Sequence, residues 1–265
     1  MSLAVISPST DLRTGQGFCW LRRRSGFTLA EILVVIAIIS ILAVLAIPAL
    51  TSISGAGSIT SASYTISGAI QYARSYAMAH DTYTWVGFFE EDGTKASANP
   101  AQAGVGRIVI STVASADGTT IYSSTAPAPV YIDPTRLTQL SKLTRIPNAH
   151  LKSYSNGSGT GSTFATRPPL VSANGRIGDT APPSGALPYF QYPVGVAGSA
   201  QYTFTNVLQF SPRGEVLVSG MAGALTPLVE VGLQPAHGDV ANMVSSDLIA
   251  LQVAGISGNV ILYRQ

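Results

Sequence analysis

The chain has almost no cysteine and few charged residues. Its single cysteine among 265 residues is Cys19, so neither an intramolecular disulfide nor a metal site built from several cysteines can form. Lysine, arginine, aspartate and glutamate make up 11% of the chain, whereas 46% is hydrophobic. So few charges argue against a long, solvent-exposed helical protein. The 26 glycines and 16 prolines indicate instead a β-rich domain with many turns.

Positive charge is concentrated at the start of the chain. Residues 1–26 carry four arginines and one aspartate, which gives this segment a charge of +3. The whole chain has a net charge of +2, so the remaining residues sum to −1. A chain without residues 1–26 would be close to neutral, which disfavours nucleic-acid binding. The scattered arginines that could otherwise suit DNA are Arg107, Arg136, Arg145, Arg167, Arg176, Arg213 and Arg264.

One long apolar segment follows three consecutive arginines. Residues 27–50 read FTLAEILVVIAIISILAVLAIPAL, and as a helix they would measure about 36 Å at about 1.5 Å per residue. That length suffices to cross a bilayer core of about 30 Å, so we expect a transmembrane helix and a lipid partner. The flanking positive charges predict a cytoplasmic N-terminus, with the residues after position 50 outside. These charges belong to Arg22, Arg23 and Arg24.

A carboxylate stands near the start of this apolar segment. An ionised side chain within the hydrocarbon costs about 2.5–3.5 kcal/mol on insertion scales, so Glu31 is a functional hypothesis by default. One alternative is a plain single-pass anchor in which Glu31 reaches the headgroups by accident. Another is a signal peptide cut near Ala46 or Ala49, although its apolar core would normally span only about 7–15 residues.

The residues around this carboxylate resemble the type IV prepilin processing motif. Residues 26–31 read GFTLAE, with a glycine, an aromatic residue after it and a glutamate five positions beyond the glycine. The resemblance covers residues 22–50 and implies that a prepilin peptidase cuts between Gly26 and Phe27 and then methylates Phe27. It also implies that Glu31 pairs with the N-terminal amine of a neighbouring subunit during filament assembly.

Elementary electrostatics supports this role for Glu31. Cleavage would create an ammonium group at Phe27, four residues and about 6 Å away along a helix axis. Opposite charges attract strongly in a poor dielectric, and pairing relieves the desolvation of both groups. Pairing between staggered neighbours would set the register of a filament, which is the best-attested use of a buried polar group.

A helical period continues beyond the apolar segment, and then the chain becomes β-rich. We therefore expect an α+β fold in which a long N-terminal helix packs on an antiparallel sheet. The resemblance to type IV prepilins implies that this is the pilin fold. The expected parts are a cytoplasmic leader (1–26), a transmembrane helix (27–50), an amphipathic continuation (51–82) and a periplasmic β-rich head (83–265). The predicted buried stripe of the continuation is Ile59, Ala62, Ile66, Ala69, Ile70, Ala73 and Ala77.

The head is predicted to contain short strands joined by turns. Residues 133–147 are ambiguous, because Asp133 could cap and Pro134 could begin a helix with Leu137, Leu140 and Leu143 on one face. The segment 154–193 reads as a long loop, which in a compact domain is usually functional or mobile. Strands are expected within 82–93, 106–113, 120–124, 129–133 and 200–220, and two more in 247–265 around a Gly-Ile-Ser-Gly turn.

Short stretches of the head resemble the minor pseudopilin of type II secretion that has the H-type fold. They are the turn formed by Phe210, Pro212 and Gly214, the C-terminal hairpin, and the helix end at 73–81. This resemblance implies assembly with other pseudopilins on an inner-membrane platform, into a periplasmic filament that helps export proteins. The alternatives are a minor pilin of a type IV pilus, for adhesion or DNA uptake, and a membrane-anchored periplasmic enzyme.

No catalytic residue, metal ligand or cofactor site is expected. A Gly-x-Ser-x-Gly nucleophile motif and a lysine-bearing phosphate loop are both missing. The carboxylates at 90–92 could bind Ca²⁺, but an ordinary charged turn is the preferred interpretation. The histidines have no ligand-type spacing. We interpret His80 with Asp81, His150, and His237 with Asp239 as ordinary solvated residues, and Glu90, Glu91 and Asp92 as that charged turn.

Overall fold

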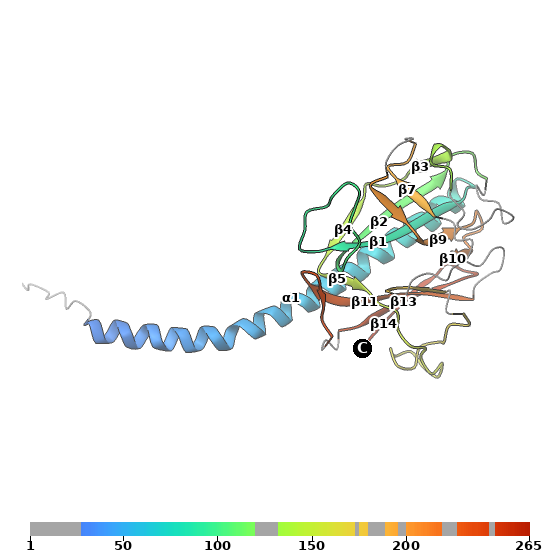
Figure 1. The fold of residues 1–265 in the computed structure, drawn as a ribbon. Helices are drawn as coiled ribbons and strands as arrows, with labels where there is room; N and C mark the ends of the chain where they lie inside the picture. The colour runs from blue at the N-terminus through green and yellow to red at the C-terminus, as the bar shows by residue number, and fades with distance from the viewer. Residues whose placement is uncertain are drawn as a thin grey trace, which may run out of the picture. The chain divides into compact units, whose positions relative to one another are not determined.

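The structure is a computed structural model (Figure 1), and its contacts divide the chain into two compact units, Met1–Pro48 and Ala49–Gln265. The expected leader, the arginines before the apolar segment, Gly26 and Phe27 lie outside the described residues. The strand expected at 120–124 and most of that at 129–133 also lie outside them. The described residues are 28–119, 132–172, 175–179, 189–195, 200–218, 227–243 and 247–265, without the side chains of 44–57.

The long helix α1 (Leu29–Ala79) buries the predicted stripe in the second unit. The stripe residues recur every three or four positions, so they lie on one side of the helix. Ala69 is partly buried, and the other six are at most 1% exposed. The helix ends where Asp81 adopts a φ of 48° and the Thr82 N–H donates to the carbonyl of Ala77 at 3.1 Å. The six stripe residues that are at most 1% exposed are Ile59, Ala62, Ile66, Ile70, Ala73 and Ala77.

The first sheet has the strand order β10-β9-β1-β2-β3, and β4 also pairs with β2. Every pairing in it is antiparallel. The strands are β1 (Thr84–Asp92), β2 (Gly106–Ser115), β3 (Leu137–Gln139), β4 (Thr144–Pro147), β9 (Asn206–Phe210) and β10 (Val216–Val218).

The second sheet has the order β12-β11-β13-β14, with β5 and β6 also paired to β11. Only the β6 pairing is parallel among these described strands. A separate hairpin joins β7 (Phe190–Tyr192) to β8 (Tyr202–Phe204). The second sheet consists of β5 (Ala149–Leu151), β6 (Arg176–Ile177), β11 (Leu228–His237), β12 (Val240–Ala241), β13 (Ile249–Ala254) and β14 (Val260–Arg264).

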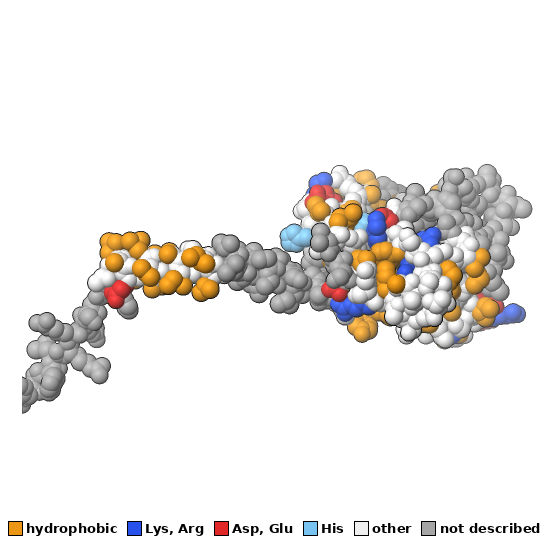
Figure 2. Space-filling model, turned by 90° about the horizontal axis from the view of Figure 1, so that it is seen from below, with side chains coloured by type: hydrophobic (Ala, Val, Ile, Leu, Met, Phe, Trp, Pro, Cys, Tyr) orange, Lys and Arg blue, Asp and Glu red, His pale blue; other side chains and the backbone are white. Residues whose placement is uncertain are grey.

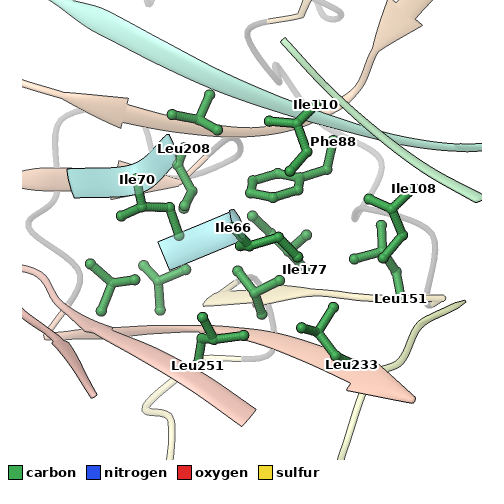
Figure 3. Packing of buried hydrophobic residues seen from close by; sticks show 14 of the residues in the cluster. Ile66, Ile70, Phe88, Ile108, Ile110, Leu151, Ile177, Leu208, Leu233 and Leu251 are labelled. Atoms are coloured by element: carbon green, nitrogen blue, oxygen red, sulfur yellow. The ribbon is translucent and has the colours of Figure 1, made fainter. Parts of the chain in front are cut away.

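The main hydrophobic core lies where α1 passes between the two sheets. Ile66 and Ile70 point into a cluster that combines side chains from both sheets (Figure 3). Phe88 and Ile110 of the first sheet lie on one side of the helix, and Leu251 of the second sheet lies on the other. Burial of apolar surface stabilises a fold by about 25 cal/mol per Å², so the packing of this shared core is the main interaction that holds α1 and the two sheets together.

A second core covers the opposite face of the first sheet. Successive strand residues point to opposite faces, so Trp85 belongs to this second core while its neighbour Val86 belongs to the main one. The indole N–H of Trp85 donates to Oε1 of Gln209 at 3.1 Å. The β7–β8 hairpin contributes Phe190 and Phe204 to the same cluster. The first sheet is therefore buried on both faces.

The fold is α+β, as the sequence predicts, and the segment 133–147, which the sequence leaves ambiguous, forms only one short helical turn. Asp133 does cap a turn that Pro134 begins, and this turn is the 3₁₀ helix η1 (Pro134–Arg136). The chain then forms β3 and β4 along β2 instead of placing three leucines on one helical face. The edge of β2 offers ladder hydrogen bonds, and Leu137 gains burial in the second core, so tertiary contacts override the helical spacing.

Strands lie where the sequence predicts them at 82–93, 106–113, 200–220 and 247–265. The C-terminal pair β13 and β14 is antiparallel across the predicted glycine turn. The long segment at 154–193 is mostly irregular in its described parts, with β6 and β7 as short strands inside it. The division into leader, membrane helix, continuation and head stays a prediction.

Candidate functional site

The first turn of α1 is closed by reciprocal hydrogen bonds between Thr28 and Glu31. The Thr28 N–H and hydroxyl donate to Oε2 of Glu31 at 2.8 Å and 3.0 Å, and the Glu31 N–H donates to the Thr28 hydroxyl oxygen at 3.2 Å. This is a capping box, in which two otherwise unpaired N–H groups at a helix start receive side-chain acceptors. The negative charge of Glu31 also complements the positive end of the helix dipole. The Thr-x-x-Glu spacing in TLAE is the sequence signal that identifies Thr28 as a capping residue. The resemblance to the prepilin motif does not by itself point to Thr28.

The helix that follows this cap is hydrophobic all round in its described part. Figure 2 shows hydrophobic side chains over the face of this segment that is in view. A helix with no polar face is suited to a hydrocarbon environment or to a large protein core. The hydroxyl of Ser40 donates to the carbonyl of Ile36 at 2.8 Å, so its polarity is satisfied within the helix. The large exposed side chains are Leu29, Ile32, Leu33, Val34, Val35, Ile36, Ile38, Ile39, Ile41 and Leu42.

Among the residues whose side chains the structure describes, no helix is both long enough and apolar enough to cross a membrane.

Comparison with known families identifies this segment. Residues 21–47 match the family model described as the prokaryotic N-terminal methylation motif. The chain therefore carries a type IV pilin-like prepilin signal. This signal implies processing by a prepilin peptidase and assembly with other pilins, and it supports a membrane-anchored pilin-type protein. It does not separate a pilin from a pseudopilin. No curated protein and no solved structure matches the chain.

Of the residues predicted to act in this prepilin signal, the structure describes Glu31. The scissile bond predicted between Gly26 and Phe27 lies just before the first described residue, Thr28. Cleavage, methylation and subunit pairing at these positions stay predictions.

The carboxylates at positions 90–92 do not form the solvated turn that the sequence suggests. They belong to strand β1, and Glu90 links the two sheets. Nδ1 of His150, on β5, lies 2.9 Å and 3.0 Å from the two carboxylate oxygens of Glu90. The N–H groups of Gly106 and Leu151 donate to the same carboxylate. His150 is thus a buried linking residue and not a solvated one.

Glu91 and Asp92 are held by other protein groups. Glu91 is 3% exposed and accepts hydrogen bonds from Arg107 at 3.0 Å and from Tyr202 at 3.2 Å. Asp92 accepts the hydroxyl and N–H of Thr94, and these bonds, together with the ammonium of Lys95, lower its pKa to about 2. Among the described residues, no group of three or more histidine, cysteine, aspartate or glutamate side chains is arranged to hold a metal ion.

A buried ion pair that the sequence does not reveal fastens the long loop to the second sheet. Arg167 and Glu230 are 2% and 3% exposed and form a bidentate pair at 2.6 Å and 2.9 Å. Arg167 also donates to the carbonyls of Ser155 and Phe164, and Gln252 donates to Glu230. The pair therefore has its remaining hydrogen-bonding groups satisfied, as a buried pair requires.

The arginines considered for DNA contact are mostly engaged within the head. Arg176 donates a hydrogen bond to the side-chain oxygen of Asn156. His80 stacks on Tyr76 with ring centroids 4.1 Å apart, and both His80 and His237 are exposed. The arginines that form ion pairs with carboxylates are Arg107, Arg136, Arg145, Arg167 and Arg264.

Proposed function

We propose that the protein is a minor pseudopilin of a type II secretion pseudopilus. It is inserted in the bacterial inner membrane as a single span, with the leader in the cytoplasm and the head in the periplasm. Prepilin peptidase cuts after Gly26 and methylates Phe27, and the inner-membrane platform assembles the mature chain with other pseudopilins. One observation carries this proposal. Glu31 caps the start of an apolar helix, and this helix start lies within the segment that matches the prepilin signal.

Before assembly, the capping box gives the Glu31 carboxylate hydrogen-bond donors from its own helix. Thr28 supplies these donors, so the carboxylate is satisfied inside an apolar segment. Cleavage then creates an ammonium group at Phe27, a stronger partner because hydrogen bonds between two ionised groups are the stronger class. Exchange of the Thr28 donors for the amine of a neighbouring subunit joins the two helices in register.

Two features of the head support the pseudopilin over the pilin. In the turn that follows Phe210, the Gly214 N–H donates to the Ser211 carbonyl at 2.8 Å, and Gly214 has a φ of 80°. The C-terminal hairpin of β13 and β14 packs on the main hydrophobic core, to which Phe210 also belongs. Both match the short stretches by which the sequence resembles H-type minor pseudopilins. The role is mechanical and recognitive, as the pilin-like signal suggests for a structural protein.

Deletion of the gene in the host tests this assignment. The proposal predicts that the deletion strain loses secreted proteins from the medium and regains them with the wild-type gene, while surface pili are unchanged. Loss of pili, adhesion or DNA uptake with normal secretion would instead identify a type IV minor pilin. Normal secretion and normal pili would contradict both assignments and favour a membrane-anchored enzyme.

A further inference from the structure

The outward face of α1 in the head is almost free of charge. Between Glu31 and Asp81 the sequence holds one charged residue, Arg74. A solvated helix normally presents charged side chains on the face that points away from the core. On α1 this face presents large aromatic side chains instead, since Tyr64 and Tyr72 are 67% and 46% exposed. Such a face is suited to contact with another protein.

Small residues recur on this face with the period of a helix-packing seam. Ser61, Gly68 and Ser75 are spaced by seven positions and are all exposed. A spacing of seven keeps residues on one side of a helix, and small side chains let a second helix approach closely. A Cβ atom built at Gly68 would meet no atom within 4 Å, so the space above it is open in the described part of the chain.

Arg74 lies at the border of this face, in a seam between two turns. Cβ atoms built at Gly214 and Gly258 would lie 3.1 Å and 2.5 Å from Nε of Arg74, so its side chain passes between them. One glycine belongs to the β9–β10 turn of the first sheet and the other to the β13–β14 turn of the second. The Val216 N–H donates to the carbonyl of Gly255 at 2.6 Å and joins these turns. Both sheets therefore fix the position of Arg74.

The guanidinium of Arg74 has no partner within the described residues. It forms neither a hydrogen bond nor an ion pair with them, and Nε is buried without an acceptor. The Arg74 side chain as a whole is partly exposed, and its two terminal nitrogens likewise have no acceptor among the described residues. A buried donor without an acceptor is destabilising, and more so when the donor is charged. A carboxylate brought by another molecule would supply a charge-assisted partner.

We propose that Arg74 and the uncharged helix face beside it dock the helix of a different pilin-type subunit that presents a carboxylate. This inference rests on the proposed function. A second copy of this chain is a poorer match, because its own helix offers no acid between positions 32 and 80, and Glu31 is needed for the N-terminal amine. The positive charge of Arg74, on an otherwise neutral helix face, thus favours a different pilin-type subunit over a second copy of this chain.

Site-specific photo-cross-linking in the host tests this inference. The mature chain contains no cysteine, so Ser75→Cys can be labelled alone with a benzophenone maleimide in membranes that hold the full set of partner subunits. Ser162→Cys, which is exposed on the long loop, is the matched control. After irradiation, mass spectrometry identifies the linked chain, and the same samples are examined for processing and for presence in the filament fraction.

We expect an adduct from Ser75→Cys, but not from Ser162→Cys, to another chain that carries an N-terminal methylation motif and an acid near the linked residue. Adding Arg74→Glu should lower its yield at least about tenfold, because like charges then face each other, while Arg74→Lys retains part of it. Changing the partner's acid to arginine should restore the yield with Arg74→Glu.

Four results would overturn the inference. An adduct between two copies of this chain, or one unaffected by Arg74→Glu, would contradict a heterotypic charge pair. A processed chain in the filament fraction without an adduct would overturn this inference and leave the proposed function standing. A chain absent from every filament fraction would overturn both.

Discussion

At Gly87 of β1, two aromatic rings leave no room for a side chain. A Cβ atom there would lie 2.6 Å from Cβ of Phe204 and 2.7 Å from Cζ of Phe190. Real Cβ atoms do not approach other heavy atoms so closely, and the two rings are stacked with centroids 5.0 Å apart. Gly87 therefore allows the β7–β8 hairpin to lie directly on the first sheet.

Replacing Gly87 should destabilise the head. We expect Gly87→Ala to lower the free energy of unfolding by about 1–3 kcal/mol, because an overpacked core must shift to accept the added methyl group. Gly68→Ala is the matched control, since its Cβ enters open space and alanine favours a helix by up to about 1 kcal/mol. Urea titration of the purified full chain in detergent measures both, and equal effects of the two changes would contradict the packing account.

The carboxyl of Asp92 is expected to titrate well below its ordinary pKa of 3.8. The hydroxyl of Thr94, the ammonium of Lys95 and the N–H of Thr94 all favour the charged form and lower its pKa to about 2. Since the pKa is lower in the folded state, the stabilisation is present above pH 4 and is lost as the pH falls towards 2. An NMR pH titration of the Asp92 carboxyl should show this midpoint, and Thr94→Val should raise it. A midpoint near 3.8 in the unmodified chain would show that these hydrogen bonds do not form.

Among the elements, those specified by local patterns could be predicted from the sequence. The stripe of α1 follows from apolar residues three and four positions apart, and the strands β1, β2, β9 and β10 follow from β-type segments that end in turns. The ambiguity at 133–147 has a physical cause, because a leucine spacing of three fits both a helix and two strands docked on β2. The neighbouring strand, which decides between them, is not visible in the local sequence.

The buried pairs of the head could not be predicted for a related reason. Glu90 meets His150, 60 positions later, and Arg167 meets Glu230, 63 positions later. The sequence shows that these charged residues are present. Which of them pair depends on how distant strands and loops come together in the fold. The capping box is the opposite case, because Thr28 and Glu31 are three positions apart and the motif is readable.

The long loop depends on Arg167 for its attachment to β11. We expect Arg167→Ala to lower the free energy of unfolding by about 3–5 kcal/mol, because it leaves the Glu230 carboxylate buried without its partner. The double change Arg167→Met with Glu230→Met should cost less, since no unpaired charge remains.

Arg136→Ala is the control for that experiment. Its exposed pair with Asp117 should contribute at most about 1 kcal/mol. Chemical unfolding together with limited proteolysis of residues 155–166 measures the effect. If Arg167→Ala costs no more than Arg136→Ala, the buried pair is not what holds the loop.

For the whole molecule, assembly should depend on the single acid in the apolar segment. We expect Glu31→Leu to leave insertion and cleavage intact but to remove the chain from the sheared filament fraction, because the new amine would then lack its partner. Thr28→Ser keeps a capping hydroxyl and should assemble normally. Immunoblots of membrane and filament fractions provide the measurement, and normal assembly of Glu31→Leu would show that the charge pair is dispensable.

The mature N-terminus of the chain decides whether the protein is processed as a prepilin. Intact-mass measurement and N-terminal sequencing should be made on protein from membranes of the host. A processed prepilin would begin at Phe27 and carry one added methyl group, and this is the result that we expect. An unprocessed chain, or one cut near Ala46 or Ala49, would contradict it, and Glu31 would then be an incidental charge in an ordinary anchor or signal peptide.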